Sequence, residues 1–268
     1  MEVEEMRPLK FIGIELKSMP QFIGTLLLTP AVMVYLIWDK LSNVNITLSS
    51  SVFPANPSLQ DHILFNVTRK TGIFTSFTIA QQGAFYNAVS VTILFEFLVG
   101  GLLAAVIFGV PMTRGTIIHD IASLGSKRKT LAVRGLFLVL CALLLAGLSA
   151  IFLFYLPQVF GVHPDIRFLL SVLTTSFLTI ITSAALVLSL VALSRDLIVP
   201  LIGVFAVFIG TFGGSNLSHL LLPFKDLTFV LWNAGRFGHP GAYIYTGLTI
   251  YGALTVLSVK AFEGGDYY

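Results

Sequence analysis

Charged residues are scarce in this chain of 268 residues. They make up 11% of it, whereas apolar residues make up 56% and the mean hydropathy is +0.90. Soluble domains carry about 25% charged residues. A chain this poor in charge lacks enough polar surface to face water on all sides. The composition therefore excludes an ordinary soluble domain and predicts an integral membrane protein.

Motifs that carry chemistry are missing as well. No Gly-x-x-x-x-Gly-Lys-Ser/Thr loop occurs, so the chain has no phosphate cradle of its own. The five histidines are scattered and the one cysteine, Cys141, lies in an apolar stretch as a packed thiol, so no metal-ligand spacing and no disulfide is expected. Neither a Gly-x-Ser-x-Gly elbow nor a His-Glu-x-x-His helix is present. We therefore expect no catalytic residue, no metal and no cofactor in this chain.

Long apolar runs are what the sequence does contain. A run of about 20 residues is needed to cross the roughly 30 Å hydrocarbon core of a bilayer. Because a single segment in lipid must satisfy its backbone hydrogen bonds internally, each run is predicted to be a helix, which gives an all-α membrane protein. The six predicted spans are 22–38, 88–110, 136–157, 168–193, 197–213 and 242–259.

The basic residues divide unevenly between the two sides of these spans. If the N-terminus is cytoplasmic, ten of the 16 Lys and Arg residues lie inside. Lys and Arg accumulate in cytoplasmic loops of membrane proteins. We therefore predict a multi-pass protein of the cell membrane with both termini in the cytoplasm. The net charge of +3 reflects this topology and does not indicate nucleic-acid binding.

Three segments outside the spans have their own character. Residues 1–21 place apolar side chains on one helical face between charged ones, which predicts an amphipathic helix in the cytoplasmic interface; a frayed terminus is the alternative. Residues 39–87 are rich in Ser, Asn, Thr and Pro and are predicted to be an external segment. Residues 214–240 are apolar but interrupted, which predicts a pair of short external re-entrant helices before the last span.

The second predicted span carries an acidic residue, Glu96. A carboxylate within a membrane is energetically expensive and by default indicates function, so Glu96 is a possible pathway residue that handles substrate or protons. The alternatives are a position near the interface, a cap on a neighbouring helix, or a protonated carboxyl. Small residues in the same span predict close helix packing: Gly100, Gly101, Ala104, Ala105 and Gly109.

A short basic segment, residues 111–135, separates the second and third predicted spans. The rest of the chain is nearly all compatible with lipid, so this is where it can meet soluble proteins. The segment contains Arg114-Gly115-Thr116, Ala122-Ser123, Ser126-Lys127-Arg128 and then Arg134. In this order and spacing it resembles the cytoplasmic loop of ABC-2 type transporter permeases, which commonly reads Glu-Arg-Gly-Thr, an apolar stretch, Ser-Pro-x-Ser-Arg and Gly-Lys.

The chain departs from the family loop at four places. Thr113 stands where an acidic residue is usual, Leu124 replaces the proline, Lys127 replaces an arginine, and Val133-Arg134 replace Gly-Lys. Three other segments resemble the family in the same order along the chain. They are Ile14-Glu15-Leu16 followed by Pro20 and Thr29-Pro30, then Leu222-Pro223-Phe224 with Asp226, and finally Phe262 with Asp266.

The resemblance implies the membrane-spanning subunit of an ATP-driven exporter. Such a permease pairs with a second permease, either a copy of itself or a homologous subunit, and with ABC ATPase subunits that bind ATP and Mg. Residues 114–124 would then form the coupling helix that docks on the ATPase, with charged residues at the rim and isoleucines in a groove. The implied coupling residues are Arg114, Gly115, Thr116, Ile117, Ile118, His119, Asp120 and Ile121.

Other interpretations of these residues stay open. The basic segment can instead be a positive-inside anchor that meets anionic membrane lipid. Arg195 and Asp196, just before the fifth predicted span, form either a hinge, a second ATPase contact, or a surface ion pair worth about 0–1 kcal/mol. The alternative functions are a membrane channel not driven by ATP, an envelope scaffold protein, and an intramembrane enzyme that uses Glu96. Nothing in the sequence identifies a substrate.

Overall fold

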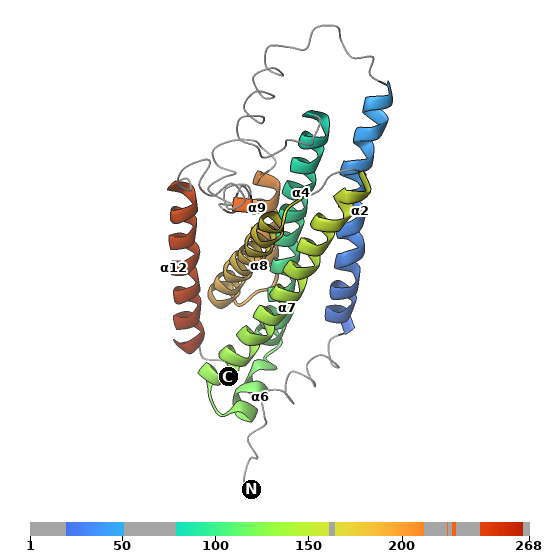
Figure 1. The fold of residues 1–268 in the computed structure, drawn as a ribbon. Coiled ribbons are helices and arrows are strands. Elements are labelled where there is room, and N and C mark those ends of the chain that lie inside the picture. The colour runs from blue at the N-terminus through green and yellow to red at the C-terminus, as the bar shows by residue number, and fades with distance from the viewer. Residues whose placement is uncertain are drawn as a thin grey trace.

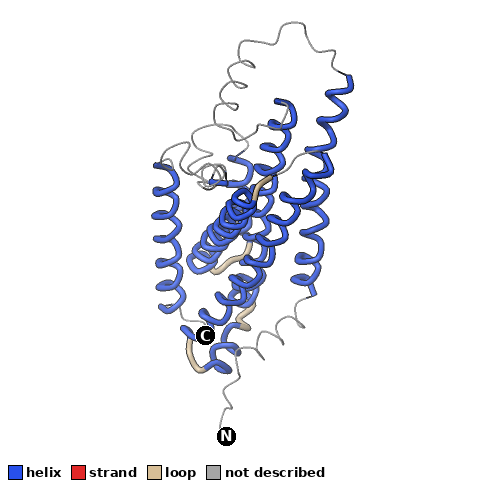
Figure 2. The backbone as a smooth tube through the Cα atoms, viewed as in Figure 1, coloured by secondary structure: helices blue, strands red, loops and turns tan. Residues whose placement is uncertain are grey.

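The computed structural model describes residues 20–50, 79–160, 164–211, 224, 227–228 and 242–264, and every regular element within these ranges is helical (Figure 2). The elements, labelled as in Figure 1, are α2 (Pro20–Ser50), α4 (Ile79–Ala104), the π-helix η1 (Ala105–Gly109), α5 (Val110–Thr113), α6 (Ile117–Leu124), α7 (Lys127–Tyr155), the 3₁₀ helix η2 (Leu156–Phe160), α8 (Ile166–Ser194), α9 (Ile198–Thr211) and α12 (Ala242–Gly264). The all-helical fold predicted from the apolar runs is confirmed for this part of the chain.

Within the described residues, four helical stretches are long and apolar enough to cross a membrane. They are Asn87–Thr113, Lys127–Val159, Ile166–Ser194 and Ile244–Gly264. They overlap the predicted spans 88–110, 136–157, 168–193 and 242–259. α9 has only 14 residues, which at 1.5 Å per residue gives about 21 Å, less than the roughly 30 Å core of a bilayer. The arrangement with six spans therefore stays a prediction.

The first helix differs from the prediction in its length. The predicted span ended at residue 38 and an external segment began at 39, but α2 continues to Ser50. Residues 39–50 are polar yet contain neither proline nor glycine, so nothing in them stops a helix that is already formed. Hydropathy marks where a helix leaves lipid, and it does not mark where the helix ends.

Several predicted segments lie largely outside the described residues. The predicted interfacial helix, 1–21, overlaps them only at the start of α2. Of the external segment 39–87, the described parts are the end of α2 and the start of α4. Of the predicted re-entrant region 214–240, only Phe224 and Leu227–Thr228 are described, and their side chains are buried.

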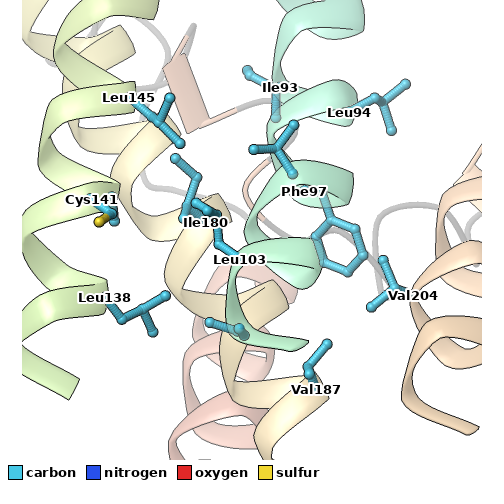
Figure 3. Close-up of a cluster of buried hydrophobic side chains, with 14 of the residues drawn as sticks. Ile93, Leu94, Phe97, Leu103, Leu138, Cys141, Leu145, Ile180, Val187 and Val204 are labelled. Atoms are coloured by element: carbon cyan, nitrogen blue, oxygen red, sulfur yellow. The ribbon is translucent and has the colours of Figure 1, made fainter. Parts of the chain in front are cut away.

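α8 lies at the centre of the bundle. It packs against α4, α7, α9 and α12, while α2 covers α4 and α7 (Figure 1). Figure 3 shows the buried side chains between these helices: Ile180 of α8 lies among side chains of α7 that include Cys141, and Phe97 of α4 lies on the side of Val204 of α9. Cys141 is a free, buried thiol, in agreement with the packed thiol expected from the sequence.

α4 and α8 approach each other closely at two glycines. A Cβ atom added to Gly100 would lie 2.8 Å from the main-chain oxygen of Ile180, and one added to Gly101 would lie 2.8 Å from a methyl group of Val204 and 2.9 Å from Oγ of Ser183. These positions therefore have no room for a side chain. The small-residue packing predicted for this span is confirmed at both positions.

The end of α12 is fixed beside the start of α7. Lys127 Nζ donates to the main-chain oxygen of Glu263 at 3.1 Å, and Arg128 Nε donates to Glu263 Oε1 at 2.7 Å. The Arg128 side chain is 82% exposed, so solvent screens this ion pair and it contributes little to stability. Figure 1 shows α6 at this same end of the bundle, together with the start of α2.

We predict that Gly100→Ala destabilises the protein while Gly147→Ala does not. At Gly100 the new methyl group meets backbone, which cannot move aside easily, so about 1–3 kcal/mol of folding free energy should be lost. A Cβ at Gly147, on α7, meets nothing within 4 Å, so the higher helix propensity of alanine should leave stability equal or raise it by up to about 1 kcal/mol. Thermal unfolding of the purified variants in the same detergent measures both. Equal stability of the two variants would contradict the close α4–α8 contact.

Candidate functional site

The basic segment, residues 111–135, contains the end of α5, the short helix α6 between two turns, and the first nine residues of α7. Gly115 has φ +71 and Gly125 has φ +79, a region that residues with a Cβ rarely adopt. Gly125 ends α6 by donating its N–H to the carbonyl of Ile121 at 2.9 Å, and the side chain of Ser126 then caps α7 by accepting from the N–H of Lys129 at 3.1 Å. The sequence thus specifies an eight-residue helix with a turn on either side.

The residues implied as ATPase contacts do not all face outward. The side chains of Arg114, Thr116, Ile118 and His119 are exposed. Gly115 and Ile121 are partly buried. Ile117 is fully buried, so in this structure it packs within the protein and is not available to fill a groove in a partner. We call these four exposed residues, two just before α6 and two in its first turn, the outer face of α6.

Asp120 points toward the bundle instead of standing at a charged rim. Its Oδ2 atom lies 2.5 Å from Nη2 of Arg134 on α7, and the side chains of Asp120 and Arg134 are 15% and 3% exposed. Nη1 of Arg134 also donates to the main-chain oxygen of Ile107, in η1. Arg134 therefore joins α6, α7 and the π-helical end of α4, and we call this set of contacts the Arg134 link.

The carbonyl of Ile107 is available to Arg134 because of a proline. In an α-helix this carbonyl would accept from the N–H four residues later, but that residue is Pro111, which has none. The helix widens just before the proline, where the N–H of Val110 donates to the carbonyl of Ala105, five residues back. Such π-helical turns are rare and often occur at functional sites. Arg134 supplies the donor that Pro111 lacks.

Arg195 and Asp196 form the turn between α8 and α9. Arg195 has φ 53 and ends α8 with its N–H bonded to the carbonyl of Val191 at 2.8 Å. Oδ1 of Asp196 accepts from the N–H of Ile198 at 3.1 Å and so caps α9. Both side chains are exposed and form no ion pair with each other, so of the three sequence-based alternatives the surface pair is wrong. They can still be reached by a partner.

Glu96 lies inside the bundle and away from α6. It is fully buried on α4, and the hydroxyl groups of Ser149 on α7 and Ser176 on α8 lie beside its carboxyl group. It is neither at a helix end nor at an exposed surface. Within the described parts of the chain, no group of three His, Cys, Asp or Glu residues is placed to hold a metal ion.

No protein-family model matches this chain, and neither a curated protein nor a solved structure matches it. The functional interpretation therefore depends on the geometry described above and on the loop residues of the basic segment.

We predict that breaking the Arg134 link is much more costly than breaking the exposed Arg128–Glu263 pair. Asp120→Ala leaves the buried guanidinium without its counter-ion and should cost about 3–5 kcal/mol of folding free energy. Glu263→Ala, the control, should cost little folding free energy because solvent screens the exposed Arg128. Denaturant unfolding of the two variants measures these losses.

The double variant Asp120→Leu with Arg134→Met should recover much of the loss, because replacing a whole buried ion pair by apolar residues is often neutral. If Asp120→Ala were as stable as Glu263→Ala, the buried ion pair would be absent in solution.

Proposed function

We propose that this chain is the membrane-spanning subunit of an ATP-driven ABC exporter. The observation that carries the proposal is α6, a short helix at one end of the bundle with an exposed outer face and a buried ion pair to the helices behind it. Four helices able to cross a membrane and the absence of a phosphate-binding loop from the sequence agree with a permease that depends on a separate ATPase subunit.

In the proposed complex the outer face of α6 docks on the ATPase subunit. Ile118 is 36% exposed, and in the sequence it lies between Arg114 and His119, whose side chains are also exposed. An apolar side chain flanked by charged or polar ones suits a groove with a polar rim. ATP and Mg are bound by the ATPase alone. Arg195 and Asp196, at the exposed turn between α8 and α9, are candidates for a second contact or a hinge.

The Arg134 link gives a route from the docked helix into the membrane. Displacement of α6 acts on Asp120, which pulls on Arg134, and Arg134 is bonded to the carbonyl of Ile107 in η1. α4 continues from η1 to the tight contact of Gly100 with Ile180 of α8. Motion of α6 is therefore passed to the two helices at the bundle centre. The translocation pathway then forms with a second permease, a copy of this chain or a homologous subunit.

Two substitutions to glutamate on the outer face of α6 should prevent ATPase binding without unfolding the protein. We expect Arg114→Glu combined with Ile118→Glu to reduce the ATPase recovered with the chain by at least about tenfold, as expected for the loss of two contacts of about 1 kcal/mol each. Arg167→Glu is the matched control, because Arg167 is exposed at the start of α8, outside the proposed interface. Affinity purification from native membranes, with the recovered proteins identified by mass spectrometry, measures the loss.

Recovery of no ATPase with the unaltered chain would overturn the proposal. Substrate flux in reconstituted vesicles that continues without ATP and in the presence of vanadate would favour the channel or scaffold alternative.

Pro111→Ala should separate ATPase binding from coupling. Alanine restores the N–H that the carbonyl of Ile107 lacks, so η1 can close into a regular α-helix and its bond to Arg134 is weakened. We expect ATPase recovery to stay unchanged, while stimulation of the ATPase by the permease falls several-fold. ATP hydrolysis by the reconstituted complex measures this. Unchanged stimulation would mean that η1 takes no part in transmission.

A further inference from the structure

The position of Glu96 is fixed by contacts between α4 and α8. One residue further on, the main-chain oxygen of Phe97 accepts from Oγ of Ser183 at 2.5 Å. Four residues further on, Gly100 lies against the backbone of Ile180. This register brings Glu96 level with Ser176, at a junction of α4, α7 and α8 where all the surrounding side chains exclude solvent.

Three of the four side-chain oxygen atoms at this junction form no hydrogen bond of normal geometry with the described residues. These three atoms are the two carboxyl oxygens of Glu96 and the hydroxyl oxygen of Ser176. Ser149, also fully buried, donates to the carbonyl of Leu145 at 3.0 Å and lies 3.2 Å from the sulfur of Met33 on α2. A hydroxyl that donates its hydrogen keeps lone pairs to offer. Two carboxyl and two hydroxyl oxygens are thus gathered at one fully buried point.

The charge of Glu96 has no counter-ion on the helices described. The other buried charged side chain among the described residues is Arg134. It pairs with Asp120 and bonds Ile107, eleven residues from Glu96 along α4, a distance of about 16 Å at 1.5 Å per residue. An ionised carboxylate taken out of water without a partner costs several kcal/mol. The described residues therefore supply no positive charge that balances an ionised Glu96.

Other ionisable groups on the packed helices lie elsewhere. On α7, Cys141 is eight residues from Ser149, or about 12 Å. Asp39 and Lys40 on α2 pair with each other at 3.2 Å, and Arg167 on α8 is exposed. α9 contains no ionisable residue. The remaining ionisable side chains described on α2, α5, α7 and α8 and in their adjoining turns are Tyr35, Arg114, Lys127, Arg128, Lys129, Tyr155, Asp165, Arg195 and Asp196, each at a helix end or exposed. On α12, which packs against α8, Tyr251 is buried, Tyr245 and Lys260 are exposed, and Glu263 pairs with Arg128.

We propose that Glu96, Ser149 and Ser176 form an intramembrane site for one small monovalent cation, a proton or a sodium ion. The donor atoms are all hard oxygens, which suit such cations and not soft transition metals. One carboxylate balances one single positive charge, whereas a divalent ion would leave net charge buried. Because α4, α7 and α8 each contribute a group, the cation stabilises their packed arrangement. The site does not depend on an ATPase partner, so its test uses this chain alone.

The test measures thermal unfolding of the purified full chain in lipid nanodiscs. In one series sodium replaces choline at constant ionic strength and fixed pH; in the other the pH is varied without sodium. A ligand that binds only the folded protein raises the unfolding temperature as its concentration rises. A sodium site therefore gives a rise with added sodium, and a proton site gives a rise as the pH falls.

Glu96→Gln keeps the shape of the side chain and removes its charge, so the dependence shown by the unaltered chain should be abolished. Ser176→Ala should weaken the apparent affinity about tenfold, the effect of losing one contact to a charged group. Two control variants should keep the full dependence. Glu263→Gln removes an acid that pairs with the exposed Arg128, and Thr174→Val removes an exposed hydroxyl from α8.

A second measurement does not depend on stability. Hydrophobic carbodiimides modify protonated carboxyl groups within membranes, so labelling of Glu96 should occur in either case and should be slowed by sodium if sodium binds. A response to sodium that Glu96→Gln abolishes assigns the site to sodium, and a response to pH alone that it abolishes assigns it to a proton. The same response in the unaltered chain and in Glu96→Gln, together with no labelling of Glu96, overturns the proposal.

Discussion

The buried guanidinium of Arg134 imposes the constraint on which the end of the bundle that carries α6 depends. A guanidinium that is 3% exposed must find partners for its charge and its hydrogens. It takes them from two other elements: the carboxylate of Asp120 on α6 and the carbonyl of Ile107 in η1. Each partner is itself incomplete without Arg134, because Asp120 is mostly buried and Ile107 precedes a proline by one turn. The contacts of Arg134 with Asp120 and with the carbonyl of Ile107 therefore hold together three elements: α6, the start of α7 and η1 at the end of α4.

The two turns beside α6 strengthen this arrangement. Left-handed glycines at 115 and 125 let the chain reverse sharply on both sides of an eight-residue helix. α6 is held to the bundle by the buried side chains of Ile117 and Leu124 and by the ion pair of Asp120. A short helix held at so few buried residues can transmit a displacement through its ion pair, since the pair is strong at short distance and weakens when stretched. A helix embedded by a broad apolar face would resist displacement instead.

The sequence predicted the helices, which are marked by neighbouring residues, and missed the contacts between residues that are distant in the sequence. Apolar runs located the helices that became α4, α7, α8 and α12, and the small residues of α4 indicated its contact with α8. The end of α2 was missed because polarity was taken as the end of the helix. Asp120 was predicted to lie at the charged rim of a docking surface. Its ion-pair partner, Arg134, lies fourteen residues away on another helix, so the sequence alone did not reveal the pair. Pro111 did carry a usable signal, since a proline leaves the carbonyl four residues earlier without a donor, but only the fold identifies Arg134 as the donor that replaces it.

The π-helical turn η1 contains Ile107, one of the partners of Arg134, and directly follows α4, which carries Glu96, so η1 relates the two sites. A π-helical turn holds one residue more than the α-helix around it. If it closed into a regular α-helix, the residues on one side would turn by about 100°, the rotation of one helical residue, relative to those on the other. Gly100 and Gly101 lie in close contact with α8 and α9, which favours rotation on the Ile107 side, where it would weaken the bond between the Ile107 carbonyl and Arg134. The glycine contact thus holds α4 and α8 together beside the Glu96 junction, so a movement of α6 that is passed to both helices leaves the junction closed unless it separates α4 from α8.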